Sequence, residues 1–347
     1  MSLHSICFRV DADEQIGMGH FVRCLSLAKQ AQKKGALISF LMGKTNQKVL
    51  DILTAQNIQI NQLSDVFDLT PKSNLGPIVI TDIFNNFTYQ RKQKLLHYMV
   101  ELSQQFRKFI YFDDAGKSAL RRDLKNLQSD LVFTPYVGET GGEHIFAGPD
   151  YFILDDKYEN IPSRQVKESA CRILISCGGS DPKEISQKIL VGLNNILDYK
   201  LEILIICGGG FSIDNKKKIA SLSSKSPHNC KILNAPDNLS KHMLWCDLAI
   251  GTSGLTKYEL AATGTPFLMI SIDAIHDEIN KPFAAQNTAI DLGISTDFPT
   301  FEITNKARSI LSNVTQRQAM ADAGQALVDG RGCDRVLNLM ETLCETQ

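Results

Sequence analysis

Residues 5–35 read SICFRVDADEQIGMGHFVRCLSLAKQAQKKG, and this stretch decides the fold class. It opens with SICFRV, a short apolar run that ends at Asp11, as a buried strand does. After a polar loop, apolar residues recur at helical spacing from Phe21 to Ala31, and Gly35 is a residue type that ends helices. The stretch therefore predicts a strand, a glycine-rich loop and a helix, in that order.

The same alternation continues through the first half of the chain. We expect strands at residues 37–42, 78–83, 109–114 and 130–137, and helices at residues 47–56 and 89–105. Apolar runs without strict alternation, separated by helices, are typical of a parallel sheet that is covered on both faces. The charged stretch from Pro149 to Ala170 is expected to link two lobes.

The pattern starts again at residue 171 and predicts a second sheet. Strands are expected at 171–177, 201–207, 231–236, 247–253 and 266–272, and helices at 183–197, 239–245, 255–263, in the lysine-rich stretch after Gly210, and twice near the end. The predicted fold class is α/β, with two Rossmann-like doubly wound parallel sheets facing a cleft lined by strand-to-helix loops. We place the domains at 1–160 and 161–347, with the last helix able to pack back on the first domain.

Composition excludes several classes of protein. The chain has 347 residues, 43% of them hydrophobic, which is too apolar for disorder. Its 37 Lys+Arg balance 38 Asp+Glu, so there is no electrostatic case for nucleic acid or an anionic membrane as partner. No apolar run is long enough for a membrane span, and the start lacks the features of a signal peptide, so we expect a cytoplasmic protein.

Nine cysteines are present, none of them at C-x-x-C spacing. Cys7, Cys177 and Cys207 lie within or at the end of apolar strand-like runs, where a free thiol packs as a small hydrophobe. The sequence therefore predicts neither a metal centre nor disulfides built from cysteine.

The first loop that could carry chemistry is GMGH, residues 17–20. A dinucleotide fingerprint would need glycine or alanine where Val22 stands, so NAD is disfavoured. His20 begins a helix whose positive end disfavours imidazolium, which makes a neutral histidine and a general base plausible. Arg23, one turn later, is a candidate for an anionic substrate group. The alternative is a solvated histidine near a helix cap.

The second loop is CGGSDP, residues 177–182. Ser180 or Asp181 can cap a helix, and Pro182 suits its first position. Backbone amides at such a helix start bind phosphate, so we expect a diphosphate contact here, against the alternative of a tight turn. The Walker sequence is absent, so hydrolysis of a nucleoside triphosphate is not indicated. For the glycines at 208–210 both readings stay open.

The third loop is GTSGLTKYE, residues 251–259, again between a strand and a helix. The Glu259 carboxylate could accept hydrogen bonds from ribose hydroxyls. Thr256 and Glu259 also have the spacing of a capping box, and the two readings are balanced.

Acidic residues gather at the predicted strand ends. They are Asp11, Asp13, Asp82, Asp113 and Asp114. A hard-metal site is one interpretation. Loop caps with hydrogen bonds to sugar hydroxyls are the other, and the sequence leaves both open.

FRVDADEQIGMGHFVRCLSLAKQ resembles the signature F-R-x-D-x-x-x-x-I-G-x-G-H-x-x-R-x-L-x-L-A of the UDP-2,4-diacetamido-2,4,6-trideoxy-β-L-altropyranose hydrolases of pseudaminic acid biosynthesis. Further motifs of that family stand in the same order, covering nearly the whole chain, at residues 111–116, 130–137, 146–158, 175–182, 251–272, 289–293 and 327–336. The resemblance implies an architecture similar to GT-B glycosyltransferases. It also implies a metal-independent, cofactor-free hydrolase in which water attacks the anomeric carbon with inversion and releases UDP.

The resemblance also implies roles for particular residues. His20 would be the general base on the N-terminal, sugar-binding domain, and Gly17 and Gly19 would shape the loop beneath the sugar and diphosphate. On the C-terminal, UDP-binding domain the matching residues are Gly178, Gly179, Ser180, Ser253, Gly254, Leu255 and Glu259, with Glu259 on ribose.

The sequence departs from the family pattern at two places. Phe84 stands where many members carry a tyrosine, and residues 274–278, AIHDE with His276, replace an Asn-Gln pair. Because a lost polar contact changes discrimination, the sugar itself is expected to differ more than UDP. Two alternatives stay open: a glycosyltransferase in which the same base activates an acceptor hydroxyl, and a non-catalytic nucleotide-sugar binding protein.

Overall fold

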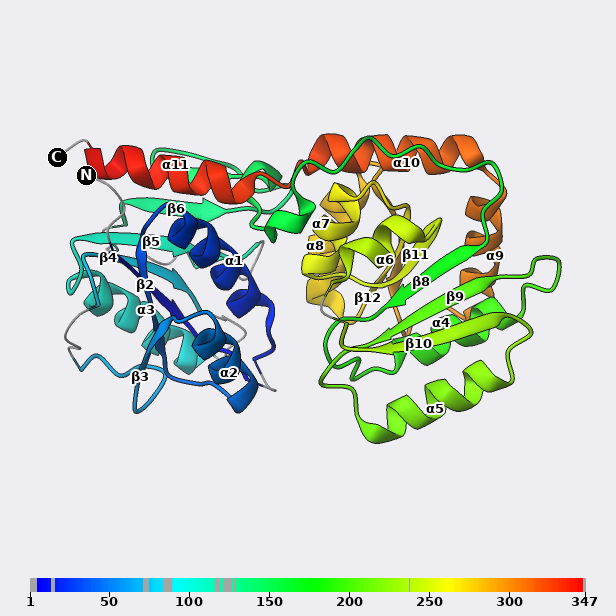
Figure 1. Cartoon of the computed structure of the whole chain (residues 1–347), viewed down its shortest axis with the longest axis horizontal. Coiled ribbons are helices and arrows are strands. Elements are labelled where there is room, and N and C mark those ends of the chain that lie inside the picture. The colour runs from blue at the N-terminus through cyan, green and yellow to red at the C-terminus, as the bar shows by residue number, and fades with distance from the viewer. Residues whose placement is uncertain are drawn as a thin grey trace. The chain divides into compact units, whose positions relative to one another are not determined.

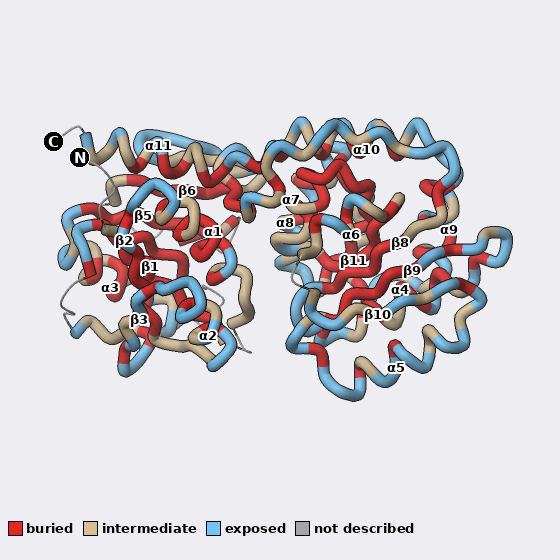
Figure 2. Tube along the Cα trace, in the orientation of Figure 1, coloured by how far each residue is buried: buried red, intermediate tan, exposed pale blue. Residues whose placement is uncertain are grey.

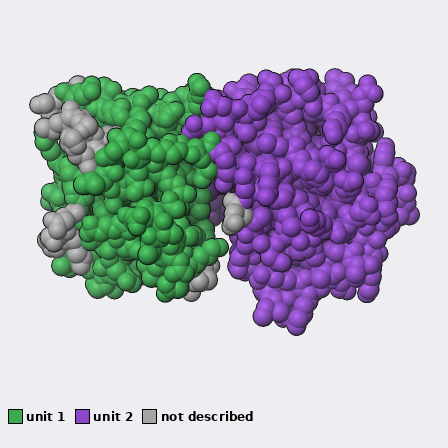
Figure 3. Space-filling model, viewed as in Figure 1, with its two compact units in different colours: residues 1–156, 330–347 green, residues 157–329 purple. Residues whose placement is uncertain are grey.

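The computed structural model describes residues 5–13, 16–70, 75–83, 89–115, 119–120, 127, 129–236 and 238–345. The chain forms two compact units, shown in different colours in Figure 3. Unit 1 comprises residues 1–156 and 330–347, and unit 2 comprises residues 157–329. The domains predicted at 1–160 and 161–347 differ from these units mainly at the end of the chain, because residues 330–347 return to unit 1.

The described part of unit 1 contains a seven-stranded sheet in which every neighbouring pair is parallel (Figure 1). The strand order is β3-β2-β1-β4-β5-β6-β7. The bounds are β1 Ser5–Val10, β2 Leu37–Met42, β3 Gln59–Gln62, β4 Ile78–Asp82, β5 Lys108–Phe112, β6 Leu131–Thr134 and β7 Ile145–Ala147. The order reverses between β1 and β4, as in doubly wound folds.

Helices cover both faces of this sheet because side chains alternate along its strands. They are α1 Gly19–Lys33, α2 Gln47–Ala55, α3 Tyr89–Ser103 and α11 Gly332–Glu345. Phe8 of β1 packs in the core cluster that includes residues of α1 and α11, and its ring stacks on Phe40 at 5.2 Å. Cys7, the preceding residue, packs in the cluster on the other face with Leu95 of α3. Figure 2 shows the buried strands as the centre of the unit.

Helix α11 belongs to unit 1 through specific contacts with residues 150–154. The Cys333 thiol donates to the carbonyl of Leu154 at 3.3 Å, and Arg335 donates to the carbonyl of Asp150 at 3.2 Å. Its apolar side includes Val336 and Leu337, both fully buried. The last helix therefore completes the core that the first strands begin.

Unit 2 contains, in its described residues, a six-stranded parallel sheet of order β10-β9-β8-β11-β12-β13. The strands are β8 Arg172–Ser176, β9 Glu202–Cys207, β10 Asn229–Asn234, β11 Leu248–Thr252, β12 Phe267–Ser271 and β13 Ala289–Ile294. The helices are α4 Ile185–Asn194, α5 Ile213–Ser224, α6 Ser240–Trp245, α7 Leu255–Ala262, α8 Ala274–Ala284, α9 Thr300–Leu311 and α10 Val314–Leu327. The α/β class and both parallel sheets are confirmed.

Several elements differ from the sequence prediction. Strands β3, β7 and β13 and helix α8 were not predicted, and three helices, not two, follow β13. The three missed strands lie at sheet edges. Edge strands need no continuous apolar run, and β3 reads QINQ with no fully buried residue. Helix α8 contains Pro282, which interrupts the pattern that identifies a helix.

All nine cysteines are free thiols, and Cys7, Cys177 and Cys207 are at most 3% exposed. Of the helices that are described, none combines the length and the apolar character needed to cross a membrane.

Candidate functional site

The predicted base lies at the point in unit 1 where the strand order reverses. β1 pairs with β4, the loop after β1 leads into α1, and β4 ends at Asp82. His20 Nδ1 lies 2.6 Å from Asp82 Oδ1. The His20 side chain is 16% exposed, whereas that of Asp82 is 1% exposed. Ligands of doubly wound sheets bind at this edge, so the pair occupies the expected position for chemistry.

Arg23 shares the same carboxylate. Its Nε and Nη2 atoms donate to the two oxygens of Asp82, each at 2.7 Å, and its Nη1 donates to the Tyr136 hydroxyl at 2.9 Å. The guanidinium also lies over the Phe112 ring, 5.4 Å from its centroid. Two parallel bonds fix both partners rigidly. Arg23 is 3% exposed and holds Asp82 in place. Its contact with an anionic substrate group stays a prediction.

The charges of this group set one another's protonation. Burial alone would lower the pKa of His20, but the Asp82 carboxylate outweighs burial and raises it. Burial would raise the pKa of Asp82, yet Arg23 and His20 hold it well below its usual value. The helix start by itself favours neutral imidazole, whereas the Asp82 carboxylate favours imidazolium, and the pKa of His20 is raised.

Two more groups titrate within this cluster. Burial raises the pKa of Asp114 to about 6, against the opposing charges of His20 and Arg23. Burial also raises the pKa of Tyr136 to about 12, so its hydroxyl stays neutral. Sequence reasoning missed Tyr136, and it named Asp82 and Asp114 only as acidic strand ends. The adjacency of β1 and β4 is the signal that would have paired Asp82 with His20.

Gly17 and Gly19 shape the loop that precedes His20. Gly17 has φ +85°, a left-handed conformation that favours glycine, and a Cβ added there would meet no atom of the described residues within 4 Å. Gly19 is the first residue of α1 and is half-buried. The backbone at Gly17 therefore faces open space next to the base.

The other acidic strand-end residues bind backbone amides. The bonds run from Gly43 N to Asp11 Oδ1 (2.7 Å), Ile16 N to Asp13 Oδ1 (2.7 Å) and Leu120 N to Asp113 Oδ1 (2.7 Å). Within the described ranges, no three His, Cys, Asp or Glu side chains form a group that could hold a metal ion. These carboxylates act as loop caps.

In unit 2, the predicted diphosphate loop differs from expectation at its helix. α4 begins at Ile185, not at Pro182, and Asp181 bridges the gap. The buried Asp181 carboxylate accepts the amides of Ile185 at 2.8 Å and Ser186 at 3.0 Å. The chain's own carboxylate thus occupies the anion position at this helix start. Gly178, Gly179 and Ser180 form an exposed turn before it.

The glycines at 208–210 pack against that turn. A Cβ on Gly208 would collide with the backbone of Gly178 and Gly179. The Gly210 amide donates to the Gly179 carbonyl at 2.9 Å. Close backbone packing therefore explains the glycine at 208, which the sequence left open.

The start of α7 has a different character from that of α4. Its N-cap is Gly254, and no hydrogen bond from a side chain caps it among the residues described. Thr256 lies inside the helix, so the capping-box reading of Thr256 and Glu259 is wrong. Ser253, Leu255 and Glu259 are half-buried, and Gly254 is exposed. An exposed helix start without a side-chain cap suits an anionic ligand.

Lys257, in the first turn of α7, is a feature that the sequence did not reveal. It is 4% exposed, and its ammonium donates to Asn280 Oδ1 of α8 at 3.1 Å. Asn280 in turn donates to the Ser271 hydroxyl of β12 at 2.8 Å. Burial lowers the pKa of Lys257 to about 7, against the charge of Asp291. This chain of contacts links α7, α8 and β12.

The two departures from the family pattern have different outcomes. Phe84 lies outside the described residues. Residues 274–278 form the first turn of α8, where Asp273 caps the helix by accepting the His276 amide at 2.9 Å and also contacts His276 Nδ1 at 2.7 Å. The segment that departs from the resembled pattern is therefore a capped helix start.

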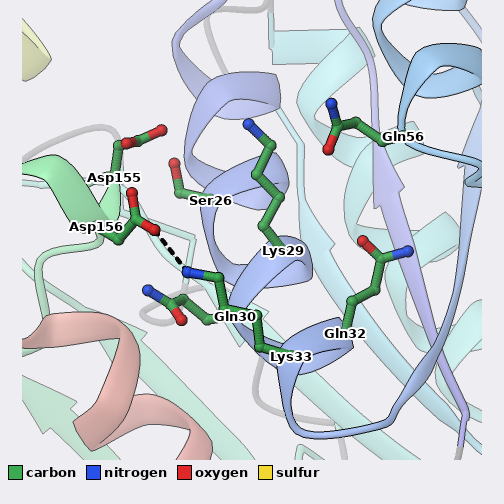
Figure 4. A pocket seen from close by; sticks show the side chains of 8 residues that line it. All are labelled: Ser26, Lys29, Gln30, Gln32, Lys33, Gln56, Asp155 and Asp156. Carbon is green, nitrogen blue, oxygen red and sulfur yellow. Dashed lines mark hydrogen bonds and ion pairs between the residues drawn. The ribbon is translucent and has the colours of Figure 1, made fainter.

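A separate hollow lies beside α1, with Gln56, Asp155 and Asp156 also in its lining (Figure 4). Its volume is about 440 Å³, and Ser26, Lys29 and Lys33 contribute to its lining from α1. Lys33 pairs with Asp156 at 2.6 Å, but both side chains are about half exposed, so water screens the pair. His20 does not line this hollow.

No protein-family model matches the chain. The chain is 27% identical over 346 residues to the spore coat polysaccharide biosynthesis protein SpsG of Bacillus subtilis (strain 168), a match covering 97% of this chain and 98% of that protein. It is 25% identical over 283 residues to the uncharacterized protein MJ1062 of Methanocaldococcus jannaschii, a match covering 76% of this chain and 55% of that protein.

Solved structures of similar fold cover almost the whole chain. Acinetobacter baumannii MurG matches with a TM-score of 0.68 at 18% identity, over 97% of this chain and 99% of that one. CalG4, the calicheamicin glycosyltransferase, matches with a TM-score of 0.65 at 12% identity, over 99% and 98%. Anabaena Alr3699/HepE in complex with UDP and glucose matches with a TM-score of 0.59 at 13% identity, over 98% and 100%. These likenesses show a fold of the GT-B glycosyltransferase type.

Proposed function

We propose that the chain cleaves the bond between UDP and the anomeric carbon of a sugar, with His20 as general base. The observation that carries this proposal is the 2.6 Å contact between His20 Nδ1 and Asp82. An ionised carboxylate only accepts hydrogen bonds, so Nδ1 carries the proton and Nε2 is the atom that exchanges one. Asp82 also stabilises the imidazolium that forms when Nε2 takes up a proton.

The proposed reaction needs one proton transfer. His20 Nε2 takes the proton of an O–H group as its oxygen bonds to the anomeric carbon. The bond from that carbon to the diphosphate oxygen breaks, and UDP leaves with the electron pair. No carboxylic acid has to protonate the leaving group, because diphosphate is stable as an anion once its charge is held.

For UDP, we propose contacts within unit 2 at two loops. The start of α7 offers the amides of Gly254 and Leu255 to the diphosphate, with Ser253 beside them, and Glu259 accepts hydrogen bonds from ribose. Support comes from the exposed Gly254 and the lack of a side-chain cap in the described residues. The turn of Gly178, Gly179 and Ser180 is the second proposed contact. The amides at the start of α4 are not part of it, because they already bind the Asp181 carboxylate.

Transfer of the sugar to an acceptor hydroxyl is the form of the reaction that the comparisons favour. MurG and CalG4 share the fold, and the SpsG relative is named for polysaccharide biosynthesis. In such a glycosyltransferase, His20 would deprotonate the acceptor.

Hydrolysis is the second candidate, and a specific observation favours it. The segment at residues 8–30 resembles the signature of hydrolases that act on a UDP-linked diacetamido-trideoxy sugar in pseudaminic acid biosynthesis. Water would then take the place of the acceptor hydroxyl, with inversion at the anomeric carbon.

The test incubates the protein with UDP-amino sugars in water enriched in heavy oxygen, with EDTA, and with or without hydroxyl acceptors. Mass spectrometry then locates the label and the sugar. Sugar found only on an acceptor identifies a transferase, and label in free sugar identifies a hydrolase. Label in a phosphate, or UDP binding without any turnover, contradicts the proposal.

The matched variants are His20→Ala and His97→Ala. His97 is exposed on α3 of the same unit. We expect His20→Ala to lose roughly 10²-fold or more in turnover while UDP still binds, and His97→Ala to keep full turnover. Equal turnover of the two variants would remove His20 from the reaction.

A further inference from the structure

A pocket of about 340 Å³ opens in unit 2 beside Trp245. It lies between the stretch at residues 162–167 and the start of β8, where Arg172 is the first residue. Asp247, which also lines it, directly precedes β11. The pocket is therefore at the amino-terminal ends of β8 and β11, whereas the loops proposed for UDP follow their carboxyl ends.

Four cationic side chains line this pocket, against one carboxylate among the described residues. The cations are Arg164, Lys167, Arg172 and Arg317, and the carboxylate is Asp247. The Asp247 carboxylate is already engaged, because it accepts the amides of Cys171 and Arg172 at 2.9 Å each. The lining thus carries an excess of positive charge.

The two more buried guanidiniums bind neutral groups. Arg164 donates to the Met243 carbonyl at 3.1 Å and to the Thr265 hydroxyl at 3.0 Å. Arg317, 1% exposed, donates to the carbonyls of Ile310 at 2.8 Å and Lys167 at 2.6 Å. Carbonyl and hydroxyl oxygens satisfy the N–H groups but leave the positive charges in place. Burial lowers the pKa of both arginines; Cys246 and Asp247 oppose this shift at Arg164, and Asp247 opposes it at Arg317.

The two remaining cations are the more exposed ones, and Arg172 also pairs with Glu202, which does not line the pocket. Lys167 is exposed, and no ion pair to it is found in the described part of the chain. Arg172 is 35% exposed; its Nε donates to Glu202 at 3.3 Å, and its guanidinium lies 5.4 Å from the centre of the Trp245 ring. The indole, with Leu244 beside it, supplies an apolar wall.

We propose that this pocket binds a small molecule that carries a phosphate group on a planar or apolar body, with the phosphate on Lys167 and Arg172 and the body against Trp245. Guanidinium and ammonium groups are the protein's usual phosphate ligands, and a concave site with an apolar wall and a few convergent polar groups is the usual form of a ligand pocket. The site is independent of His20 and of the loops proposed for UDP, so it would serve an effector and not the substrate.

Trp245 is the single tryptophan of the chain, so its emission can follow binding at this pocket. Because Trp245 also lines a second hollow beside β9 and β10, the Lys167 variant is needed to assign a change in emission to this pocket. Phenyl phosphate and inorganic phosphate are titrated into the full chain at constant ionic strength while tryptophan emission is followed. We expect a saturable change, with phenyl phosphate binding more tightly than inorganic phosphate. Iodide should quench Trp245 more efficiently than caesium, because the lining is positive.

Lys167→Gln is the decisive variant, since the side chain is exposed and its loss leaves the fold intact. We expect it to weaken phenyl phosphate binding about tenfold, as a lost charged contact does. Lys217→Gln, on exposed α5, is the matched control and should leave affinity unchanged. A change in emission that does not saturate, or equal affinities of the two variants, would overturn the proposal. So would loss of binding in Glu259→Gln, because the probe would then occupy the α7 loop.

Discussion

His20 Nδ1 lies 2.6 Å from Asp82 Oδ1 although 62 positions separate the two residues, and Arg23 donates two hydrogen bonds to the same carboxylate. One buried anion thus orients the imidazole and neutralises the guanidinium. Arg23 holds the carboxylate and the carboxylate holds the ring, and in the proposed reaction Nε2 takes up the proton. Asp82 is therefore a positioning residue in the proposed reaction.

Asp82→Asn should lower turnover by about 10²–10⁴-fold. It should also move the acid limb of the pH–rate profile to lower pH. The sign follows from the pKa of His20, which the Asp82 charge raises. Without that charge, Nε2 is free of its proton at a lower pH, even though the ring is poorly held. The measurements are kcat against pH and an NMR titration of the His20 ring.

Asp156→Asn is the control for this substitution, because Asp156 is exposed and pairs with Lys33 of α1. It should leave both the rate and the pH profile unchanged. A slower Asp82→Asn enzyme whose acid limb stays in place would indicate that Asp82 only supports the fold.

The fold was predictable wherever the signal is local. The apolar run SICFRV is β1, and the pattern from Phe21 to Ala31 is α1 ending before Gly35. Edge strands such as β3 carry no such run, because an edge strand has a neighbouring strand on one side only and stays partly exposed to solvent. The contact between His20 and Asp82 depends on β1 lying beside β4, which is a property of the whole sheet and not of either segment.

Asp181 shows, within a single turn, that residue types alone do not predict every contact. The sequence identifies it as a capping residue, and it does bind the first amides of α4. Its φ of 45° lets the chain make an extra turn before the helix, so the carboxylate takes the place predicted for phosphate. Residue types alone do not distinguish an anion supplied by the chain from one supplied by a ligand.

Asp181→Ala should lower the free energy of unfolding by about 1–2 kcal/mol, the usual cost of losing a helix cap. UDP affinity at low temperature should change little, because α4 is not a proposed contact. Denaturant unfolding and calorimetric UDP titration measure the two effects. Asp214→Ala, in the exposed first turn of α5, is the comparison and should be close to neutral. A large loss of UDP affinity in Asp181→Ala would show that Asp181 also positions the neighbouring turn of Gly178, Gly179 and Ser180, and a gain would show that the freed amides of α4 bind UDP.

Gly17→Ala should mainly lower turnover, whereas Gly208→Ala should mainly lower stability. Gly17 has φ +85°, and no atom of the described residues would contact an added Cβ, so alanine adds strain of about 1–2 kcal/mol without a clash there. That loop should shift and turnover should fall, while the fold survives. Gly208→Ala drives a methyl group into the Gly179 carbonyl, and we expect a loss of stability larger than at Gly17. Unfolding midpoints compare the two, and a Gly17→Ala protein with normal turnover would separate the loop from the reaction.

Lys257 makes the stability of unit 2 depend on pH. Its pKa falls from the usual 10.5 to about 7 in the folded chain because the ammonium is buried. Between these values the unfolded state binds a proton that the folded state lacks, so the free energy of unfolding rises with pH. Below about pH 7 the cost of burying the charge is fully present.

Lys257→Met removes that cost, so the stability advantage of this variant over wild type should shrink by up to about 1.4 kcal/mol per pH unit from pH 7 to 10. Urea unfolding at several pH values measures this slope, with Lys217→Met on exposed α5 as the control. The lost bond to Asn280 adds a constant, so only a pH-independent difference would contradict the buried charge.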